Sequence, residues 1–246
     1  MIVAIIQARM NSYRLPGKVL ADVGGKTMLA RVVDRVARAK YVDGIIVATT
    51  DQAIDDVIVA ECGRIGVRSF RGSERDVLDR YYGAVRRWIE WGSVVRVTAD
   101  CPLIDPSVID RVIEGFLIYD VDYASNVSPR TYPRGLDTEV MTFAALEHAW
   151  MCARAPQERE HVTPFIYIHP EWFRTLSVTN ETDESDLRWT VDEQADLDMV
   201  RALYARFDNR DDFSWRDALA VARSDPRLTV MNADIMQKGA PERRTA

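Results

Sequence analysis

Hydrophobic residues in the first half of the chain alternate between continuous runs and a helical spacing. Four runs predict strands: Ile2–Gln7, Gly44–Thr50, Val67–Phe70 and Val94–Ala99. The second and fourth are rich in β-branched residues, as is typical of strands buried on both faces. Between the runs, apolar residues recur at i, i+3, i+4 and i+7, which predicts helices over residues 29–36, 54–65, 77–88 and 108–116. Alternating strands and helices predict an α/β fold with a mostly parallel sheet and helices on both faces.

The regular alternation ends near Tyr123. The stretch Asn126–Asp137 contains two prolines and a glycine and is predicted to be a loop. Beyond it the pattern predicts three strands, at Asp137–Phe143, Trp172–Val178 and Leu187–Val191, and four helices, at Ala144–Cys152, His161–Ile168, 197–207 and Trp215–Arg223. We predict a single domain over residues 1–236, with a small subdomain at about 127–180, and a disordered tail at 237–246.

Composition narrows the class of protein. The net charge of −6 argues against nonspecific nucleic-acid binding, which needs a strongly basic surface. The three cysteines are odd in number and widely spaced, so they form neither a disulfide framework nor a zinc cluster. No apolar run approaches the roughly 20 residues that span a membrane, and Met1 leads directly into a strand without a signal peptide. We therefore expect a cytoplasmic protein.

Three cations follow the first predicted strand. Arg9, Arg14 and Lys18 lie on a short loop with Pro16 and Gly17. Ligands of open α/β sheets bind at the carboxyl ends of the strands, and arginine and lysine suit phosphate oxygens. The alternative is an ordinary turn with scattered surface charges. The loop is thus a candidate seat for a nucleotide or another phosphate compound.

Two aspartates also stand where predicted strands end. Asp100 follows the fourth strand and precedes Pro102, and Asp192 follows Leu187–Val191. Each could simply be a turn or helix-cap residue, and Asp105 is a good cap for the helix that begins after it. However, Mg²⁺ binds through one or two carboxylates together with substrate phosphates. Asp100 and Asp192 are therefore the best candidate Mg²⁺ ligands.

Two further segments carry candidate binding residues. Gly72 and Ser73 lie between a strand and a helix, where they could read a base or hold an anion, or where Ser73 or Asp76 could only cap the helix. Arg134 could pair with a substrate carboxylate, and Glu139 could accept hydrogen bonds from sugar hydroxyls. Both could equally be surface charges.

Three other nucleotide-related motifs are incomplete or badly placed in this sequence. Gly24–Thr27 looks like the end of a Walker A motif but lacks its first glycine, and no G-x-G-x-x-G follows the first strand, which excludes a dehydrogenase. Asp120-Val-Asp122 has the letters of a glycosyltransferase motif but precedes an apolar segment. A nucleotide-sugar-dependent glycosyltransferase of GT-A type stays an alternative function, as does a non-catalytic nucleotide-binding protein.

Five segments together resemble the cytidylyltransferases that make CMP-activated acid sugars, and most closely the SpsF-type and 3-deoxy-manno-octulosonate enzymes. The first is Gln7-Ala-Arg-Met-Asn-Ser-Tyr-Arg-Leu-Pro-Gly-Lys18, which is similar to the family's CTP-triphosphate loop. The others are Ala48–Asp51, Arg71–Asp76 (base recognition), Asp100–Asp105 and Val191–Leu197 (both magnesium). Their order and spacing cover nearly the whole chain.

The resemblance implies a Rossmann-like nucleotidyltransferase sheet, a homodimer, Mg²⁺ as cofactor, and CTP and an acidic sugar as substrates. Arg14, Lys18 and Asp100 are expected to be catalytic, with Mg²⁺ on Asp100 and Asp192. The expected nucleotide-binding residues are Gln7, Ala8, Arg9, Arg14, Lys18, Arg71, Ser73, Asp76 and Thr98. The expected residues for the sugar acid are Asn126, Arg134, Asp137, Glu139, Glu160 and His161. The implied product is a CMP-sugar for surface polysaccharide or glycoconjugate synthesis.

Overall fold

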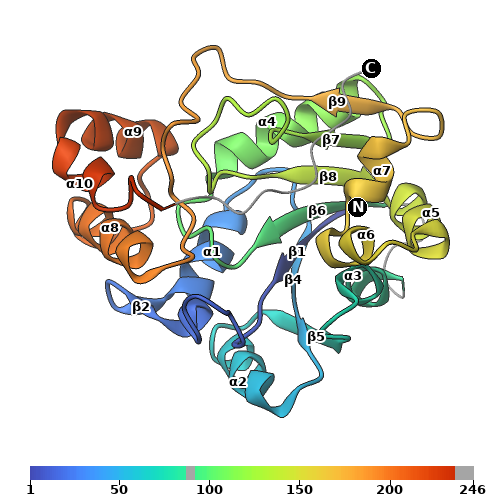
Figure 1. Cartoon of the computed structure of the whole chain (residues 1–246), viewed down its shortest axis with the longest axis horizontal. Helices are drawn as coiled ribbons and strands as arrows, with labels where there is room; N and C mark the ends of the chain where they lie inside the picture. The colour runs from blue at the N-terminus through green and yellow to red at the C-terminus, as the bar shows by residue number, and fades with distance from the viewer. Residues whose placement is uncertain (87–91, 236–246) are drawn as a thin grey trace.

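A mixed sheet runs through the middle of the molecule (Figure 1). The computed structural model describes residues 1–86 and 92–235. Within them, seven strands form this sheet in the order β5-β4-β1-β6-β8-β7-β9. Their bounds are β1 Ile2–Gln7, β4 Gly44–Thr50, β5 Arg68–Gly72, β6 Ser93–Thr98, β7 Tyr123–Ser125, β8 Glu139–Thr142 and β9 Thr175–Ser177. A small hairpin of β2 (Asp22–Val23) and β3 (Lys26–Thr27) lies apart from it.

The four strands of the first half are parallel to one another. β1 is central, with Ile5 opposite Ile46 of β4 on one side and Arg96 of β6 on the other. β8 runs antiparallel to both β6 and β7, and β9 continues parallel to β7. Because the first four strands share one direction, the loops after β1 and β6 leave the sheet at the same edge.

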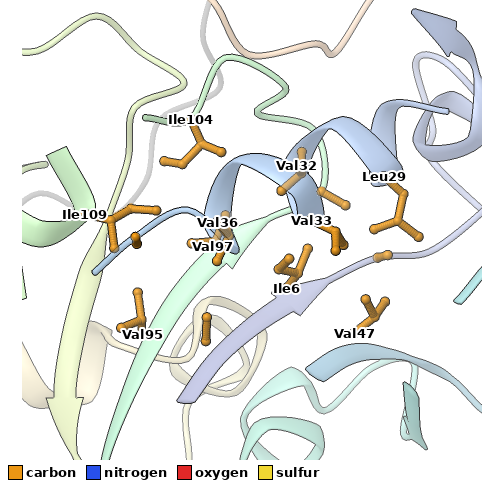
Figure 2. Close-up of a cluster of buried hydrophobic side chains, with 14 of the residues drawn as sticks. Ile6, Leu29, Val32, Val33, Val36, Val47, Val95, Val97, Ile104 and Ile109 are labelled. Carbon is orange, nitrogen blue, oxygen red and sulfur yellow. The ribbon is translucent and has the colours of Figure 1, made fainter. Parts of the chain in front are cut away.

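Helices cover both faces of the sheet because side chains alternate along each strand. In β1, Ile2, Ala4 and Ile6 belong to one buried cluster, and Val3 and Ile5 belong to another. Figure 2 shows the first cluster, in which side chains of α1 (Met28–Val36) pack onto the sheet beside Ile6, Val47, Val95 and Val97. The helical spacing of Leu29, Val32, Val33 and Val36 thus buries one face of α1, as the sequence pattern predicts.

The remaining helices are distributed over the two faces and one end of the sheet. α2 (Asp56–Arg64) and α4 (Pro106–Ile118) share the α1 face, and α3 (Val77–Val85), α5 (Phe143–Cys152) and α7 (Pro164–Ile168) pack on the other. α8 (Gln194–Ala205), α9 (Trp215–Ser224) and α10 (Pro226–Val230) gather beyond the sheet, where α8 and α9 bury a third cluster with Trp189 (Figure 1). No helix in residues 1–86 and 92–235 combines the length and apolar character needed to cross a membrane.

Two sequence-based element predictions are wrong. Leu187–Val191 is not a strand. It meets Arg134 only as an isolated bridge, because Leu187 and Trp189 pack in the third cluster away from the sheet. The helix predicted over His161–Ile168 is interrupted at Val162, whose φ is 72°. His161 is the last residue of α6 (Pro156–His161), and α7 forms the remaining part of the predicted range. The hydrophobic pattern does not predict the hairpin, β7 or α10.

The helix caps considered at Asp105 and Asp76 are present, and the structure adds one at Thr27. Asp105 accepts the backbone N–H of Ser107 at the start of α4, and Asp76 accepts that of Asp79 in α3. Thr27 caps α1 by accepting the N–H of Ala30. The end of the predicted helix over residues 77–88 and the tail at 237–246 lie outside the described residues.

Candidate active site

The loop after β1 folds around one carbonyl group. Met10 O accepts the N–H groups of Ser12 and Gly17 at 2.9 and 2.8 Å. Gly17 has a φ of 75°, a conformation that favours glycine, and it turns the chain into the short 3-10 helix η1 (Lys18–Leu20). Buried Asp55 fixes the start of the loop by accepting Met10 N–H at 2.7 Å. These bonds direct Lys18 inward, where its side chain is largely buried.

Lys18 joins the two candidate carboxylates. Its Nζ donates to Asp100 Oδ2 at 2.8 Å, to Asp192 Oδ1 at 2.9 Å and to the Val191 carbonyl at 2.7 Å. Burial lowers the pKa of the Lys18 ammonium, but Asp100 and Asp192 raise it further, so this pKa stays above its ordinary value. The end of β6 and the segment before α8 are therefore joined through a buried cation.

Asp192 is surrounded by positive charge. Its Oδ2 lies 2.8 Å from both Arg14 and Arg188. Burial raises the pKa of the Asp192 carboxyl, but Lys18, Arg188 and Arg14 outweigh it and hold this pKa below its usual range. Asp192 is thus an anion near neutral pH.

A buried carboxylate positions the Asp192 backbone. Asp196 Oδ2 accepts the N–H groups of Asp192 and Glu193 at 2.9 and 3.0 Å, and its Oδ1 accepts Arg188 Nε at 2.9 Å. Asn232, which follows α10, donates from its side chain to Asp196 Oδ1 and to the Arg188 carbonyl, both at 2.9 Å. The segment after α10 therefore helps to hold the turn that carries Asp192.

These groups open onto a cleft of about 390 Å³ at the carboxyl ends of β1 and β6. Ten of the residues expected from the sequence line it: Gln7, Ala8, Arg9, Arg14, Lys18, Thr98, Asp100, Glu160, His161 and Asp192. Glu160 and His161 reach it from the end of α6. Segments far apart in the sequence thus meet at one edge of the sheet.

The cleft also contains residues that the sequence reasoning missed. They include Ser12 and Tyr13 of the loop, Arg80 of α3 and Arg96 of β6. Ser12 and Tyr13 lie within the quoted loop and could have been included. Arg96 is the single charged residue of the apolar run that forms β6, and that interruption is the signal that was available. Arg80 follows Asp79 within a helix and carries no such signal.

Glu139 does not line the cleft but supports its wall. It is paired with Arg96 and accepts hydrogen bonds from Tyr123 at 2.5 Å and Thr163 at 2.7 Å. Its carboxylate is occupied by protein donors, because it lies inside the sheet at the β6–β8 pair. Glu139 therefore does not face the cleft directly, and a role toward a sugar stays a prediction.

Three residues expected to read the base also lie outside the cleft lining. Arg71 donates to the carbonyls of Thr50 and Gln52 and pairs with Asp56 at 2.5 Å. Ser73 accepts the Asp76 N–H at 3.0 Å, and Asp76 pairs with Arg159 of α6 at 2.6 Å. Of the two alternatives for this segment, the structure shows the capping one, and a role in base recognition stays a prediction.

The remaining expected sugar residues hold the loop 126–138 together. Asn126 is buried and exchanges hydrogen bonds with Leu136 O and Thr138 N–H, both at 2.8 Å. Asp137 forms a two-point pair with Arg130 at 2.6 and 2.8 Å. Arg134 lines a second cleft, of about 370 Å³, beside Arg188. None of these three residues lines the first cleft. The loop uses the polar groups of Asn126 and Asp137 for its own folding, and Arg134 lines the second cleft instead.

The donor set fits Mg²⁺. The described residues contain no group of three or more acidic, histidine or cysteine side chains that could hold a metal alone. However, Mg²⁺ commonly takes one or two carboxylates and completes its shell with phosphate oxygens and water. Asp100 uses Oδ2 for Lys18, while its Oδ1 contacts only the Cys101 thiol at 3.6 Å among the described residues. Asp100 Oδ1 is therefore a carboxylate oxygen that no described cation occupies, whereas both oxygens of Asp192 contact cations of the protein.

The glycosyltransferase motif does not take part in this site. Asp120 and Asp122 do not line the cleft, and Asp122 accepts the backbone N–H of Arg174 at 2.7 Å beside β9. Its role is to connect the start of β7 to β9. The structure thus offers no support for the alternative based on this pair.

Comparisons with known proteins place the chain in a family. The sequence model of the family described as "Cytidylyltransferase" matches residues 3–210. The spore coat polysaccharide biosynthesis protein SpsF of Bacillus subtilis is 33% identical over 232 residues, which cover 92% of this chain and 95% of SpsF. A cytidylyltransferase structure from Leptospira borgpetersenii has a TM-score of 0.89 at 33% identity and covers 96% of this chain and 99% of that one.

A more distant structure supports the fold. A CMP:2-keto-3-deoxy-manno-octonic acid synthetase complexed with CTP has a TM-score of 0.64 at 21% identity, covering 84% of this chain and 99% of that one. The predicted Rossmann-like α/β fold with a mostly parallel sheet is thereby confirmed. The order of the five sequence segments, the match over residues 3–210 and the full-length similarity to SpsF lead to one conclusion: the chain belongs to the cytidylyltransferase family and is a nucleotidyltransferase.

Proposed function

We propose that the enzyme transfers CMP from CTP to a hydroxyl group of a sugar acid, or of a related acid or phosphonate, with Mg²⁺ as cofactor and release of pyrophosphate. The observation that carries this proposal is the meeting of Lys18 with Asp100 and Asp192 beside Arg14. Such a cluster provides cations for a triphosphate and carboxylates for a divalent ion in one cleft.

The protein would act mainly by positioning and by balancing charge. Arg14 and Lys18 would bind phosphate oxygens of CTP and align the α-phosphorus with the acceptor hydroxyl. The hydroxyl oxygen attacks this phosphorus, the bond to the bridging oxygen of the β-phosphate breaks, and the hydroxyl proton passes to solvent. Pyrophosphate leaves with the electron pair of the broken bond.

Asp100 and Asp192 are the residues that would hold Mg²⁺. When bound, the ion neutralises phosphate charge and lowers the pKa of a coordinated hydroxyl group. Lys18 offsets the repulsion between the two carboxylates, and Arg188 with Asp196 fixes the orientation of Asp192.

The acceptor would bind near Glu160, His161 and Arg96. These residues line the cleft, and Arg96, although paired with Glu139, has an Nε without a hydrogen-bond partner that could donate to an acid group. The names of similar proteins support an acid sugar and a role in surface polysaccharide or glycoconjugate biosynthesis: SpsF is a polysaccharide biosynthesis protein, and the CTP-bound neighbour is a CMP:2-keto-3-deoxy-manno-octonic acid synthetase.

The test is a pyrophosphate-release assay with each of the four nucleoside triphosphates against a panel of sugar acids and phosphonates. We expect release with CTP, in the presence of Mg²⁺ and one class of acid acceptor. Release that needs no acceptor acid, or that is equal for ATP and CTP, would contradict the proposal. Omission of Mg²⁺ with chelator present is expected to abolish the reaction.

The family resemblance also supports a homodimer. Light scattering after size-exclusion chromatography is expected to give twice the chain mass of 28.0 kDa. A mass equal to one chain at micromolar concentration would show that the protein works as a monomer.

A further inference from the structure

Arg80 of α3 is a buried cation that the roles described so far do not explain. It is 2% exposed and lines the cleft. One of its terminal nitrogens donates to the Ser73 carbonyl at 2.7 Å, but its Nε has no hydrogen-bond partner. Buried charged groups are normally paired, because leaving such a donor without a partner is costly. The guanidinium group is therefore placed for a partner that enters the cleft.

No carboxylate within residues 1–86 and 92–235 supplies that partner. Among the described residues, Arg80 forms no ion pair, and the nearby acids are used elsewhere. Asp55 accepts Met10 N–H at 2.7 Å and the Thr50 hydroxyl, while Glu74 accepts a bond from Asn11 at 3.4 Å. The positive charge of Arg80 is thus only partly balanced at a distance.

Arg9 adds a second unbalanced charge to the same place. It lines the cleft on the loop after β1, is exposed, and forms no ion pair with the described residues. Burial lowers the pKa of the Arg80 guanidinium, and the charge of Arg9 lowers it further. Two like charges are therefore close enough to repel each other, which an anion between them would relieve.

The other cations of the cleft differ in this respect. Lys18 and Arg14 are paired with Asp192, and Arg96 is paired with Glu139. Arg9 and Arg80 are consequently where the cleft has cationic groups without ionic partners among the described residues. A bound anion would therefore form its most favourable ion pairs with Arg9 and Arg80.

We propose that Arg80 is a substrate-binding residue that, together with Arg9, holds the terminal phosphates of the nucleoside triphosphate. A terminal phosphate carries up to two charges and several acceptor oxygens, which suit two guanidinium groups. A single carboxylate carries one charge and would leave one arginine unbalanced. The identity of the nucleotide rests on the proposed function, but the phosphate subsite itself requires no turnover.

The experiment is calorimetric titration of the full-length protein with inorganic pyrophosphate, CTP and CMP, without an acceptor. Arg80→Met is expected to weaken pyrophosphate and CTP binding roughly tenfold or more, since a lost charged hydrogen bond has about this effect. CMP lacks the terminal phosphates, so its affinity is expected to change less than threefold. Arg86→Met, an exposed arginine at the end of α3 that does not line the cleft, is the matched control and should change none of the three.

Two results would overturn the proposal. Equal weakening of CMP and CTP would mean that Arg80 contacts the nucleoside part, and unchanged affinity for all three would mean that it contacts no phosphate. If Arg80→Met does not fold, Arg9→Met tests the same subsite from an exposed position, and Arg80→Lys should retain part of the pyrophosphate affinity. Because pyrophosphate binding needs neither CTP nor an acceptor, a failed transfer assay and a failed subsite are told apart.

Discussion

Lys18 is buried, yet its ammonium group donates to two carboxylates and one carbonyl oxygen. The lysine therefore connects the loop after β1 to the end of β6 and to the turn before α8. Because one ammonium group joins these segments, its charge helps to hold the two sides of the cleft together.

Replacing Asp100 should separate chemistry from folding. Asp100→Asn keeps the shape of the side chain but removes its charge, so we expect turnover to fall by roughly a thousandfold, the scale of losing one electrostatic contact to a transition state. The melting temperature should change by only a few degrees because the side chain is partly exposed. Turnover within tenfold of wild type would contradict the proposed metal role. The control is Asp51→Asn, on the exposed turn after β4, which should leave turnover unchanged.

Replacing Arg14 should affect the nucleotide more than the acceptor. Arg14→Ala removes a cation that lies 2.8 Å from Asp192 at the edge of the cleft. We expect the KM for CTP to rise roughly tenfold or more and the KM for the acid acceptor to change little. Arg64→Ala, on the exposed side of α2, is a control that loses a surface ion pair. An unchanged KM for CTP would count against the loop as phosphate site.

At the scale of elements, the loop 126–138 depends on the Arg130–Asp137 pair. Burial raises the pKa of the Asp137 carboxyl, but the bonds from Arg130 outweigh it and hold this pKa below its usual value. The folded-state pKa therefore lies below the unfolded value of about 3.9. The stabilisation is fully present above that value and is lost as the pH falls through the folded pKa.

Asp137→Asn tests this pair. The melting temperature of the variant should lie below that of wild type at pH 7, and the gap should narrow as the pH falls from about 4 toward 2. Asp120→Asn, at an aspartate whose side chain is 91% exposed, should show a small and nearly constant gap. A gap for Asp137→Asn that is independent of pH would show that the ionised carboxylate is not the stabilising group.

Gly135 joins the same loop to the segment that precedes Asp192. Its φ is 111°, and an added Cβ would lie 2.7 Å from Thr190 N and from the Trp189 carbonyl carbon. Gly135→Ala should therefore destabilise the protein by roughly 2 kcal/mol or more, from a positive φ and a clash with backbone. Gly25→Ala is a matched control, since Gly25 has a φ of 89° but no atom within 4 Å of the added Cβ. Urea unfolding measures both, and equal losses would contradict the clash.

The elements near the site were predictable to different degrees. β1 and β4 have the predicted bounds because both are buried on two faces, so every residue contributes to the pattern. Leu187–Val191 alternates apolar and polar residues as a half-buried strand does, but it pairs with Arg134 at one bridge, since its apolar side chains pack against α8 and α9 rather than in the sheet. The hydrophobic pattern predicts which side chains are buried, but it does not predict whether they pack in the sheet or against helices.

The whole molecule explains which site residues could be found from the sequence. Residues in the loops that follow parallel strands, such as Lys18 and Asp100, meet because the strand ends share one edge. Asn126 and Asp137 belong to an irregular loop, and local sequence does not distinguish groups that bond within the loop from groups that face a substrate. Arg80 lies in the middle of a helix, so only tertiary structure shows that it lines the cleft.

The hydrogen bonds of Asn232 set a minimum length for an active enzyme. The family match ends at residue 210, but Asn232 lies beyond it and supports Asp196, which in turn orients Asp192. Stopping the chain at residue 230 removes none of the described residues that line the cleft, yet turnover should drop while CTP still binds. Restoring the next five residues should recover the rate, and the catalytic unit would then extend beyond the region that the family's sequence model matches.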